Sequence, residues 1–213
     1  MKEMTKYSRV AAYLEKLFDM LNTDLFGGEL ERPIITLIPS SRSYGHYVPA
    51  PIWSIKDERR RELNIATGTL SRPIEDTIGT LVHEMCHIYN NEVLNIQDAS
   101  RGGTYHNKRF RDTAQAHGLN VTRSDKYGYC HTSPADSLIE WCIEHGLREI
   151  DINRLDIERG TGNGTRAIGG NGTPKVSVNH NHRFVCPSCG AVARAGRRIN
   201  LICGDCMRTM IET

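Results

Sequence analysis

The stretch His83-Glu84-Met85-Cys86-His87 decides how the rest of this chain is interpreted. Two histidines four residues apart on an α-helix project from one face about one turn apart, because each residue advances by about 100° and 1.5 Å. One metal ion can therefore bind both imidazoles. Glu84 flanks the same face, where its carboxylate can reach a metal-bound water. The spacing predicts a helix that carries a catalytic metal site.

The residues before this stretch predict where its helix begins. Ser71 is a typical helix cap, Pro73 suits the first turn, and the acidic pair Glu75-Asp76 complements the positive end of a helix. Apolar residues then recur at helical spacing as far as about Glu92. The packing positions of this helix are Ile74, Ile78, Leu81, Val82, Met85 and Ile88.

A third ligand is needed, because a catalytic zinc ion normally takes three protein ligands and leaves one position for water. His106 is the predicted third ligand. It follows the Gly-rich turn at 101–103 and is expected to begin the next helix, from which it can swing back to the site. Asp98 and Asp112 are alternative candidates, and Glu92 is expected to point away from the metal.

The expected chemistry follows from these roles. Zinc lowers the pKa of its bound water to about 7. Glu84 takes the proton while hydroxide attacks a peptide carbonyl, and it then returns the proton to the leaving amine. The strand expected at 63–66 is interpreted as a sheet edge on which an extended polypeptide can lie.

The remaining pattern predicts a mixed α+β fold with an N-terminal helix, a short three-stranded sheet, the metal-bearing helix and further helices. Gly27-Gly28 ends the first helix, and residues 120–133 are expected to be irregular or extended. Together these segments form a predicted first domain over residues 1–150. Beside the metal-bearing helix, helices are expected at 5–25, 106–117 and 135–144, and strands at 34–38, 44–55 and 63–66.

Two Cys-x-x-Cys pairs predict a second metal site. Four thiolates complete a closed tetrahedral zinc site, which is structural rather than catalytic. The segment that contains them, 183–213, is too short to build an adequate core, so metal is expected to drive its folding. Residues 151–182 are rich in Gly and Asn and are predicted to be a flexible linker. The four predicted ligands are Cys186, Cys189, Cys203 and Cys206.

Positive charge is concentrated toward the C-terminus. Residues 158–213 contain eight Lys/Arg and three Asp/Glu, a net charge of +5, which leaves −3 for residues 1–157 in a total of +2. Such a distribution suggests a polyanionic partner, with a solvated surface as the alternative. In the zinc segment, the arginines within 194–198 and an exposed Phe184 ring are candidates for holding DNA, although a zinc ribbon can also dock proteins.

The metal motif, together with Gly-Gly-Thr-Tyr-His-Asn-Lys-Arg-Phe at 102–110, resembles the SprT/Spartan metalloprotease family. The order of the preceding elements and the C-terminal zinc ribbon are similar too. The resemblance covers roughly 5–150 and 183–210 and is closest to the bacterial and phage-type SprT-like proteins. It implies a minimal zincin-like protease domain in which the three histidines bind the zinc ion. The Spartan branch of that family degrades proteins crosslinked to DNA and is switched on by DNA.

Two functions of different classes are therefore open. The first is a zinc-dependent endopeptidase that acts on DNA-associated proteins, with one catalytic and one structural zinc ion. The second is a noncatalytic, zinc-stabilised DNA-binding or adaptor protein in which the first metal only braces the fold. Glu84 favours the first, because a structural site needs no base. The polar start of the chain, its short apolar runs and its metal-type cysteine pairs lead us to expect a cytoplasmic protein with no membrane partner.

Overall fold

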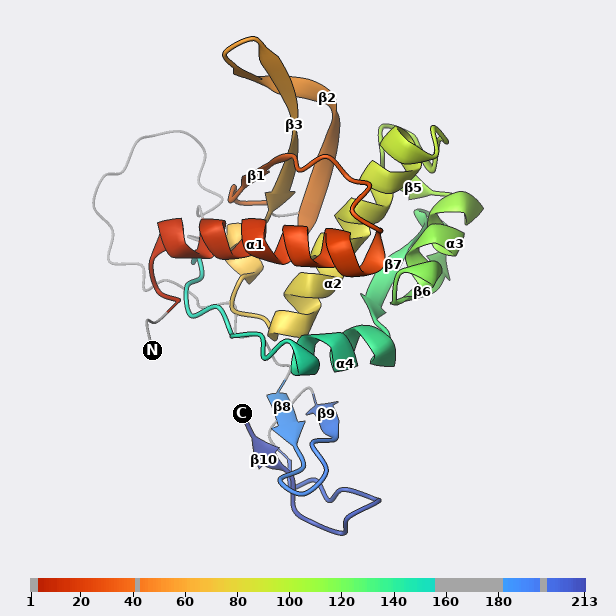
Figure 1. Cartoon of the computed structure of the whole chain (residues 1–213). Helices are drawn as coiled ribbons and strands as arrows, with labels where there is room; N and C mark the ends of the chain where they lie inside the picture. The colour runs from red at the N-terminus through yellow and green to blue at the C-terminus, as the bar shows by residue number, and fades with distance from the viewer. Residues whose placement is uncertain (1–3, 41–42, 156–181, 196–198) are drawn as a thin grey trace, which may run out of the picture. The chain divides into compact units, whose positions relative to one another are not determined.

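The computed structural model describes most of the chain (Figure 1). The described residues are 4–40, 43–155, 182–195 and 199–213. They form four α-helices and three small sheets, so the fold is mixed α+β. The chain separates into two compact units, Met1–Arg154 and Leu155–Thr213, which are described one at a time. Most of the linker predicted at 151–182 lies outside the described residues.

The first unit begins with α1 (Tyr7–Leu25), the helix that the apolar spacing predicts. One face of α1 is buried, through Val10, Leu14, Leu17, Phe18 and Leu21. The chain leaves the helix at Gly27 and Gly28, whose φ angles of +63° and +76° lie in the left-handed region that favours glycine. The predicted end of this helix is confirmed.

The first sheet has the strand order β1-β3-β2, with β1 at Ile34–Thr36, β3 at Glu58–Ile65 and β2 at Gly45–Ile55. β1 runs parallel to β3, and β2 pairs with β3 in antiparallel register. The expectation that residues 63–66 form a sheet edge is wrong, because β3 lies between the two other strands. The edge next to the metal-bearing helix is β2, and its pairing with β3 is interrupted between Val48 and Trp53.

The metal-bearing helix α2 (Ile74–Ile88) follows a short 3-10 turn, η1 (Thr67–Thr69). The predicted cap at Ser71 is wrong, because Pro73 occupies the N-cap position. The backbone N–H of Ile74 instead donates to a carboxylate oxygen of Glu149 at 2.9 Å. A distant acidic side chain therefore satisfies the positive end of α2.

The C-terminal end of α2 continues directly into a wider helical turn. Residues Tyr89–Val93 form the π-helix η2. The helical segment therefore extends about as far as predicted, but its last turn is a π-turn and not an α-turn. Such turns are frequent at functional sites. Here the turn carries the fully buried side chain of Asn90, which faces the residues around the candidate metal centre.

The second sheet has the order β4-β5-β7-β6 and was not expected as a sheet. Residues 120–133, expected to be irregular or extended, belong to the β6–β7 hairpin. The helix expected from His106 begins two residues later, because His106 lies in β5 and Asn107 caps α3 by accepting from the backbone N–H of Arg109. The elements are β4 (Ala99–Ser100), β5 (Tyr105–His106), α3 (Lys108–Ala116), β6 (Leu119–Ser124), β7 (Gly128–Pro134) and α4 (Asp136–Glu144).

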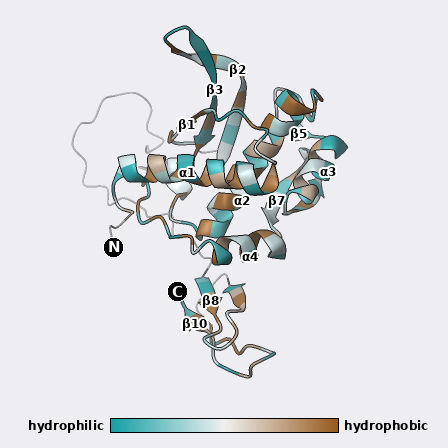
Figure 2. Cartoon of the chain, in the orientation of Figure 1, coloured by the Kyte–Doolittle hydropathy of each residue, from teal (hydrophilic) through white to brown (hydrophobic). Residues whose placement is uncertain are grey.

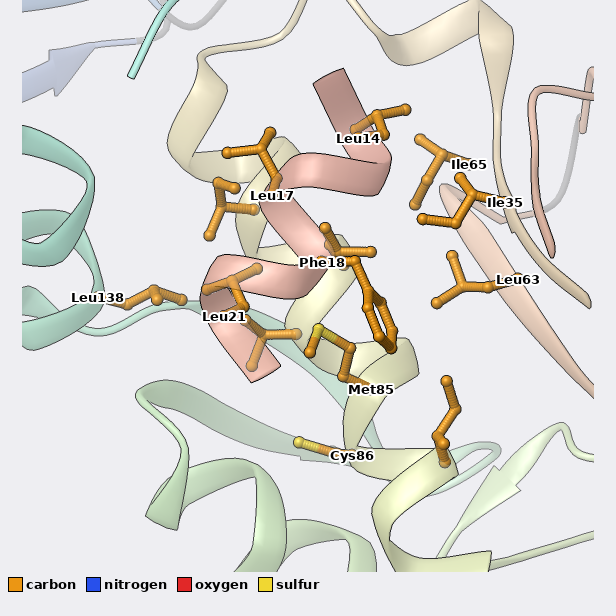
Figure 3. Close-up of a cluster of buried hydrophobic side chains, with 14 of the residues drawn as sticks. Leu14, Leu17, Phe18, Leu21, Ile35, Leu63, Ile65, Met85, Cys86 and Leu138 are labelled. Atoms are coloured by element: carbon orange, nitrogen blue, oxygen red, sulfur yellow. The ribbon is translucent and has the colours of Figure 1, made fainter. Parts of the chain in front are cut away.

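The core of the first unit holds α2 in place (Figure 3). The buried face of α1 packs against the sheet residues Ile35, Leu63 and Ile65 and against Met85 of α2. Cys86 is fully buried in the same core, so this thiol packs while the histidines beside it point elsewhere. Figure 2 shows the apolar residues of α1 and α2 and the largely hydrophilic outer end of the β2–β3 hairpin.

The second unit is a small antiparallel sheet with the order β10-β8-β9. Its strands are β8 (His182–Val185), β9 (Val192–Ala195) and β10 (Ile211–Glu212). Phe184 is only 3% exposed and packs with Cys186, Cys203 and Met210. The prediction of an exposed ring at this position is therefore wrong, because so small a unit uses its one phenylalanine as core.

Across the parts of the chain that the structure describes, none of the helices combines the length and the apolar character that crossing a membrane requires.

Candidate metal centre

The three predicted histidines meet with their Nε2 atoms facing one another. The Nε2 atom of His106 lies 2.9 Å from that of His87 and 3.2 Å from that of His83. α2 supplies His83 and His87 one turn apart, and β5 supplies His106. The β5–β7 pairing of His106 with Gly128, and not a helix, fixes the third ring.

This spacing fits a metal ion. Zinc–nitrogen bonds of about 2.0–2.1 Å in tetrahedral geometry place two ligand nitrogens about 3.3 Å apart. The two measured Nε2 separations of 2.9 and 3.2 Å lie close to that value. The three histidines could therefore hold one metal ion with little rearrangement.

Hydrogen bonds on the far side of two rings orient them for this task. The Nδ1 atom of His87 lies 2.7 Å from Oδ2 of Asp98, and the Nδ1 atom of His83 lies 3.0 Å from Oγ1 of Thr132. A protonated Nδ1 that donates to these oxygens leaves the Nε2 lone pair directed at the metal. Phe110 packs against all three rings, with centroid distances of 4.5–4.6 Å.

Asp98 is itself held by a buried chain of hydrogen bonds. Asn90 donates its amide to Oδ2 of Asp98 at 2.9 Å, and Thr113 donates its hydroxyl to Oδ1 of Asn90 at 2.6 Å. The backbone carbonyl of Asn90 also accepts from Ile96 at 2.8 Å. Asp98, an alternative ligand by sequence, thus lies behind His87 as its hydrogen-bond partner.

The other alternative ligands lie away from the three histidines. Asp112 is exposed and pairs with Arg111 at 2.6 Å. Glu92 accepts from the Tyr47 hydroxyl at 2.6 Å and pairs with Arg61 at 3.1 Å. Burial, together with the Glu92 carboxylate, raises the pKa of Tyr47 far above its usual value, so this phenol stays protonated. Glu92 links η2 to β2 and does not approach the metal centre.

Burial keeps His83 and His106 neutral in the absence of an ion. Burial lowers the pKa of His83 well below 6.5, and the neighbouring rings of His87 and His106 lower it further. Burial and His87 lower the pKa of His106 to about 4, against the opposing effect of Asp98 and of the Thr104 carbonyl. Neutral rings carry the free nitrogen lone pairs that a metal requires.

Glu84 is buried beside this centre. Burial raises its pKa to about 7, while the neighbouring His87 and a hydrogen bond from the Tyr47 backbone act in the opposite direction. A Cβ added to Gly45 would lie 3.3 Å from Oε1 of Glu84 and 2.9 Å from the carbonyl oxygen of Asn64. β2 therefore runs close to this carboxyl group, which can exchange a proton near neutral pH.

The four cysteines of the second unit also converge. Their sulfur atoms all lie within 4.8 Å of one another, and those of Cys189 and Cys203 are 3.6 Å apart. Tetrahedral zinc with sulfur bonds of about 2.3 Å places two sulfurs about 3.8 Å apart. The cluster could therefore hold one metal ion.

The two cysteine pairs share one backbone pattern. The N–H groups of Gly190 and Met207 donate to the carbonyls of Cys186 and Cys203, both at 2.9 Å. Backbone hydrogen bonds from Cys189 and Ser188 lower the pKa of Cys186 to about 7. The hydrogen bond with Cys189, together with burial, raises the pKa of Cys206 to about 12. Four thiolates so close together need a cation to remain charged.

Sequence reasoning identified the ligand types but not the residues that orient them. Thr132, Asn90 and Thr113 stand outside any motif, and Phe110 ends the stretch 102–110 with no role assigned to it there. The roles of all four depend on which strands and helices pack together. Of the orienting residues, only Asp98 could be picked out from the sequence, because it is a carboxylate that lies between the second and third histidines.

The site rests on this geometry alone, because no family model, no curated protein and no solved structure matches the chain.

Proposed function

We propose that the chain is a zinc-dependent endopeptidase of SprT-like type, in which His83, His87 and His106 bind the catalytic zinc ion. The observation that carries this proposal is the buried carboxyl group of Glu84 beside three converging imidazoles. A site that only braces a fold gains nothing from such a carboxyl, whose burial costs free energy. This argues against the noncatalytic alternative.

A zinc ion bound there supplies Lewis acidity and lowers the pKa of a coordinated water. The chain's own residues supply the proton transfers. Glu84 accepts a proton from the attacking water and delivers it to the leaving amine, for which a pKa of about 7 is suitable. Asp98 and Thr132 keep the rings of His87 and His83 in the tautomer that binds through Nε2.

The edge strand β2 is the proposed seat for the substrate. An extended polypeptide can add a strand to a sheet edge through backbone hydrogen bonds. β2 runs close to Glu84 at Gly45, and its outer half contains Pro49 and Pro51, which have no N–H to donate. Backbone pairing between β2 and a substrate strand is thus confined to about residues 45–48. Because backbone hydrogen bonds do not depend on side chains, we expect the substrates to be unfolded segments without strong sequence preference.

The second zinc ion is proposed to be structural, held by the four cysteines of the ribbon. The closed set of four thiolates leaves no position for water. The expectation that the substrates are DNA-associated proteins rests on the positive charge of the chain's C-terminal part and on the resemblance to the SprT/Spartan family.

The decisive experiment compares the wild-type chain with Glu84→Gln, both loaded with zinc and checked by metal analysis. The substrate is an unfolded protein such as casein, with and without single-stranded DNA. Glutamine keeps the size and the hydrogen bonding of the side chain but cannot accept the proton. We expect cleavage by the wild type alone, with equal zinc content in both proteins. If both proteins are equally inert under every condition, the protease proposal fails.

A further inference from the structure

Arg72 is a partly buried cation that lies directly before α2. In the described parts of the chain, no aspartate or glutamate lies within ion-pair distance of it. Burial lowers the pKa of Arg72, and the charge of Asp76 opposes this effect only in part. A guanidinium nevertheless stays protonated in a protein, so this charge is held where water solvates it poorly. An anion that binds there is therefore favoured.

Contacts on several sides hold the Arg72 guanidinium in one orientation. Its Nε donates to the carbonyl of Thr69 at 2.9 Å, and its Nη2 donates to Oγ1 of Thr80 at 3.0 Å. Its carbon lies 4.1 Å from the centroid of the Tyr44 ring. A guanidinium has five N–H groups, and these hydrogen bonds use two of them. The others, on Nη1 and Nη2, have no acceptor among the described residues and form the planar fork that matches a carboxylate.

The fork contacts α2 one helical turn before Glu84. Thr80, its hydrogen-bond partner, precedes Glu84 by four residues, which is about 6 Å along the helix. A Cβ added to Gly45 would lie 3.0 Å from Cγ2 of Thr80 and 3.3 Å from Oε1 of Glu84, so both side chains border β2 at the same residue. Tyr44, whose ring covers the guanidinium, directly precedes Gly45 in the sequence. A polypeptide that pairs with β2 and continues past Gly45 therefore reaches Arg72.

We propose that Arg72 binds a carboxylate of the polypeptide substrate and thereby fixes which peptide bond lies at the metal centre. The inference rests on the proposed protease function, to which it adds a preference at one position. Backbone pairing with β2 does not depend on side chains, so pairing alone leaves the substrate free to slide along the strand. A charge-assisted pair of hydrogen bonds to Arg72 removes that freedom. Since an extended chain advances by about 3.3 Å per residue, the carboxylate lies roughly two residues from the cleaved bond.

The substrate carboxylate can come from two sources. One is an aspartate or glutamate side chain within the polypeptide, and the other is the free C-terminus of that polypeptide; both offer the same two oxygens to the fork. Nucleic acid is not favoured as the ligand, because Arg72 with Asp76 nearby supplies too little net charge to bind many phosphates. The first source gives a protease that prefers acidic segments, and the second gives one that shortens chains from the end.

The first measurement is of binding alone, by fluorescence anisotropy of short peptides labelled at the N-terminus. The protein is the full zinc-loaded chain with Glu84→Gln, which is not expected to cleave them. The peptides share one neutral sequence and differ in a single carboxylate: a central glutamate with an amidated end, a central glutamine with the same end, or the glutamine with a free C-terminus. We expect a peptide with the right carboxylate to bind about tenfold more tightly than the uncharged one. Whichever peptide gains affinity identifies the source.

Adding Arg72→Gln to this chain should abolish the preference, because glutamine is polar but carries no charge. Arg61→Gln is the matched control, since Arg61 also lies beside β2 but already pairs with Glu92 at 3.1 Å. We expect it to keep the preference within about twofold. Zinc content and thermal unfolding show whether each variant is folded. If Arg72→Gln is not, Arg72→Lys replaces it: lysine keeps the charge but lacks the planar fork, so the preference should fall about threefold or more.

Cleavage by chains with Glu84 intact separates this inference from the protease proposal. Mass spectrometry should find the cut about two residues from the carboxylate, and Arg72→Gln should scatter the cuts along the peptide. The inference is overturned if the peptides bind equally well, if a folded Arg72 variant keeps the full preference, or if Arg61→Gln loses it to the same extent. Preferred binding of a carboxylate peptide with no cleavage by any chain would instead overturn the protease proposal and leave the carboxylate site of Arg72 supported.

Discussion

Replacement of Gly128 by alanine tests whether the β5–β7 pairing positions the third histidine. Gly128 has a φ of +66°, and a Cβ placed on it would overlap the carbonyl oxygen of His106 and lie 3.1 Å from the carbonyl carbon. The overlap involves backbone, which cannot swing aside as a flexible side chain can. The two strands must therefore move apart at the residue that supplies the third imidazole.

The expected effect has two parts. A left-handed conformation costs an alanine roughly 1–2 kcal/mol, which lowers the stability of the unit. Relief of the overlap displaces His106 by on the order of 1 Å, because non-bonded carbon and oxygen atoms approach no closer than about 3 Å. Metal–ligand distances tolerate only about 0.2 Å. We expect zinc affinity at this site to fall about 10–100-fold, as when an orienting group of a metal ligand is removed.

Gly102→Ala is the matched control. Its φ of +65° is nearly the same, but within the described residues a Cβ there meets nothing within 4 Å. Competition with a chelating dye measures zinc affinity, and thermal unfolding of the metal-free chains measures stability. We expect both variants to lose similar backbone stability and only Gly128→Ala to lose zinc affinity at the histidine site. Wild-type affinity in Gly128→Ala, or an equal loss in both variants, would refute the reasoning.

Three further predictions address the two metal centres. Asp98→Asn should weaken zinc at the histidine site about 10–100-fold, as measured by the same dye competition, because a neutral amide holds the His87 ring less firmly. Cys203→Ser should lower zinc content from two ions per chain to one by metal analysis, and loss of both ions would contradict independent sites. The metal-free chain with Glu84→Gln, which removes the opposing effect of the raised Glu84 pKa, should lose stability as pH falls from about 6.5 to about 4, because the lowered pKa of His106 means that the unfolded chain binds protons first. For His106 alone the loss is about 3 kcal/mol, and thermal unfolding at pH 7, 5.5 and 4.5 with chelator present would show it; a constant midpoint would exclude it.

Local patterns predicted the helices well and their surroundings less well. The four-residue spacing of His83 and His87 and the apolar positions of α2 depend only on helical geometry, and the structure contains that helix. The cap was mispredicted because Glu149, far along the sequence, satisfies the N–H of Ile74 in place of Ser71. No local rule can anticipate a partner at that separation.

The strand order of the sheets could not be predicted without knowing which residues far apart in the sequence contact one another. β3 is central because β1 pairs with it in parallel, a contact between Ile34 and Glu62 that spacing alone does not reveal. His106 was identified as a ligand, although it belongs to a strand and not to a helix. The hydrogen bond from Asn90 to Asp98 forms only after η2 and the chain at Asp98 pack together, so the roles of these two residues were not evident from the sequence.

The prolines of β2 have a consequence for the behaviour of the protein in concentrated solution. An exposed sheet edge is a template on which two molecules can pair and start to aggregate. Pro49 and Pro51 have no N–H with which to pair, and the broken register between Val48 and Trp53 keeps the strand from being flat and regular. Replacing both prolines with valine should therefore shorten the time that the purified chain remains free of precipitate, even if its fold and its metal content are unchanged.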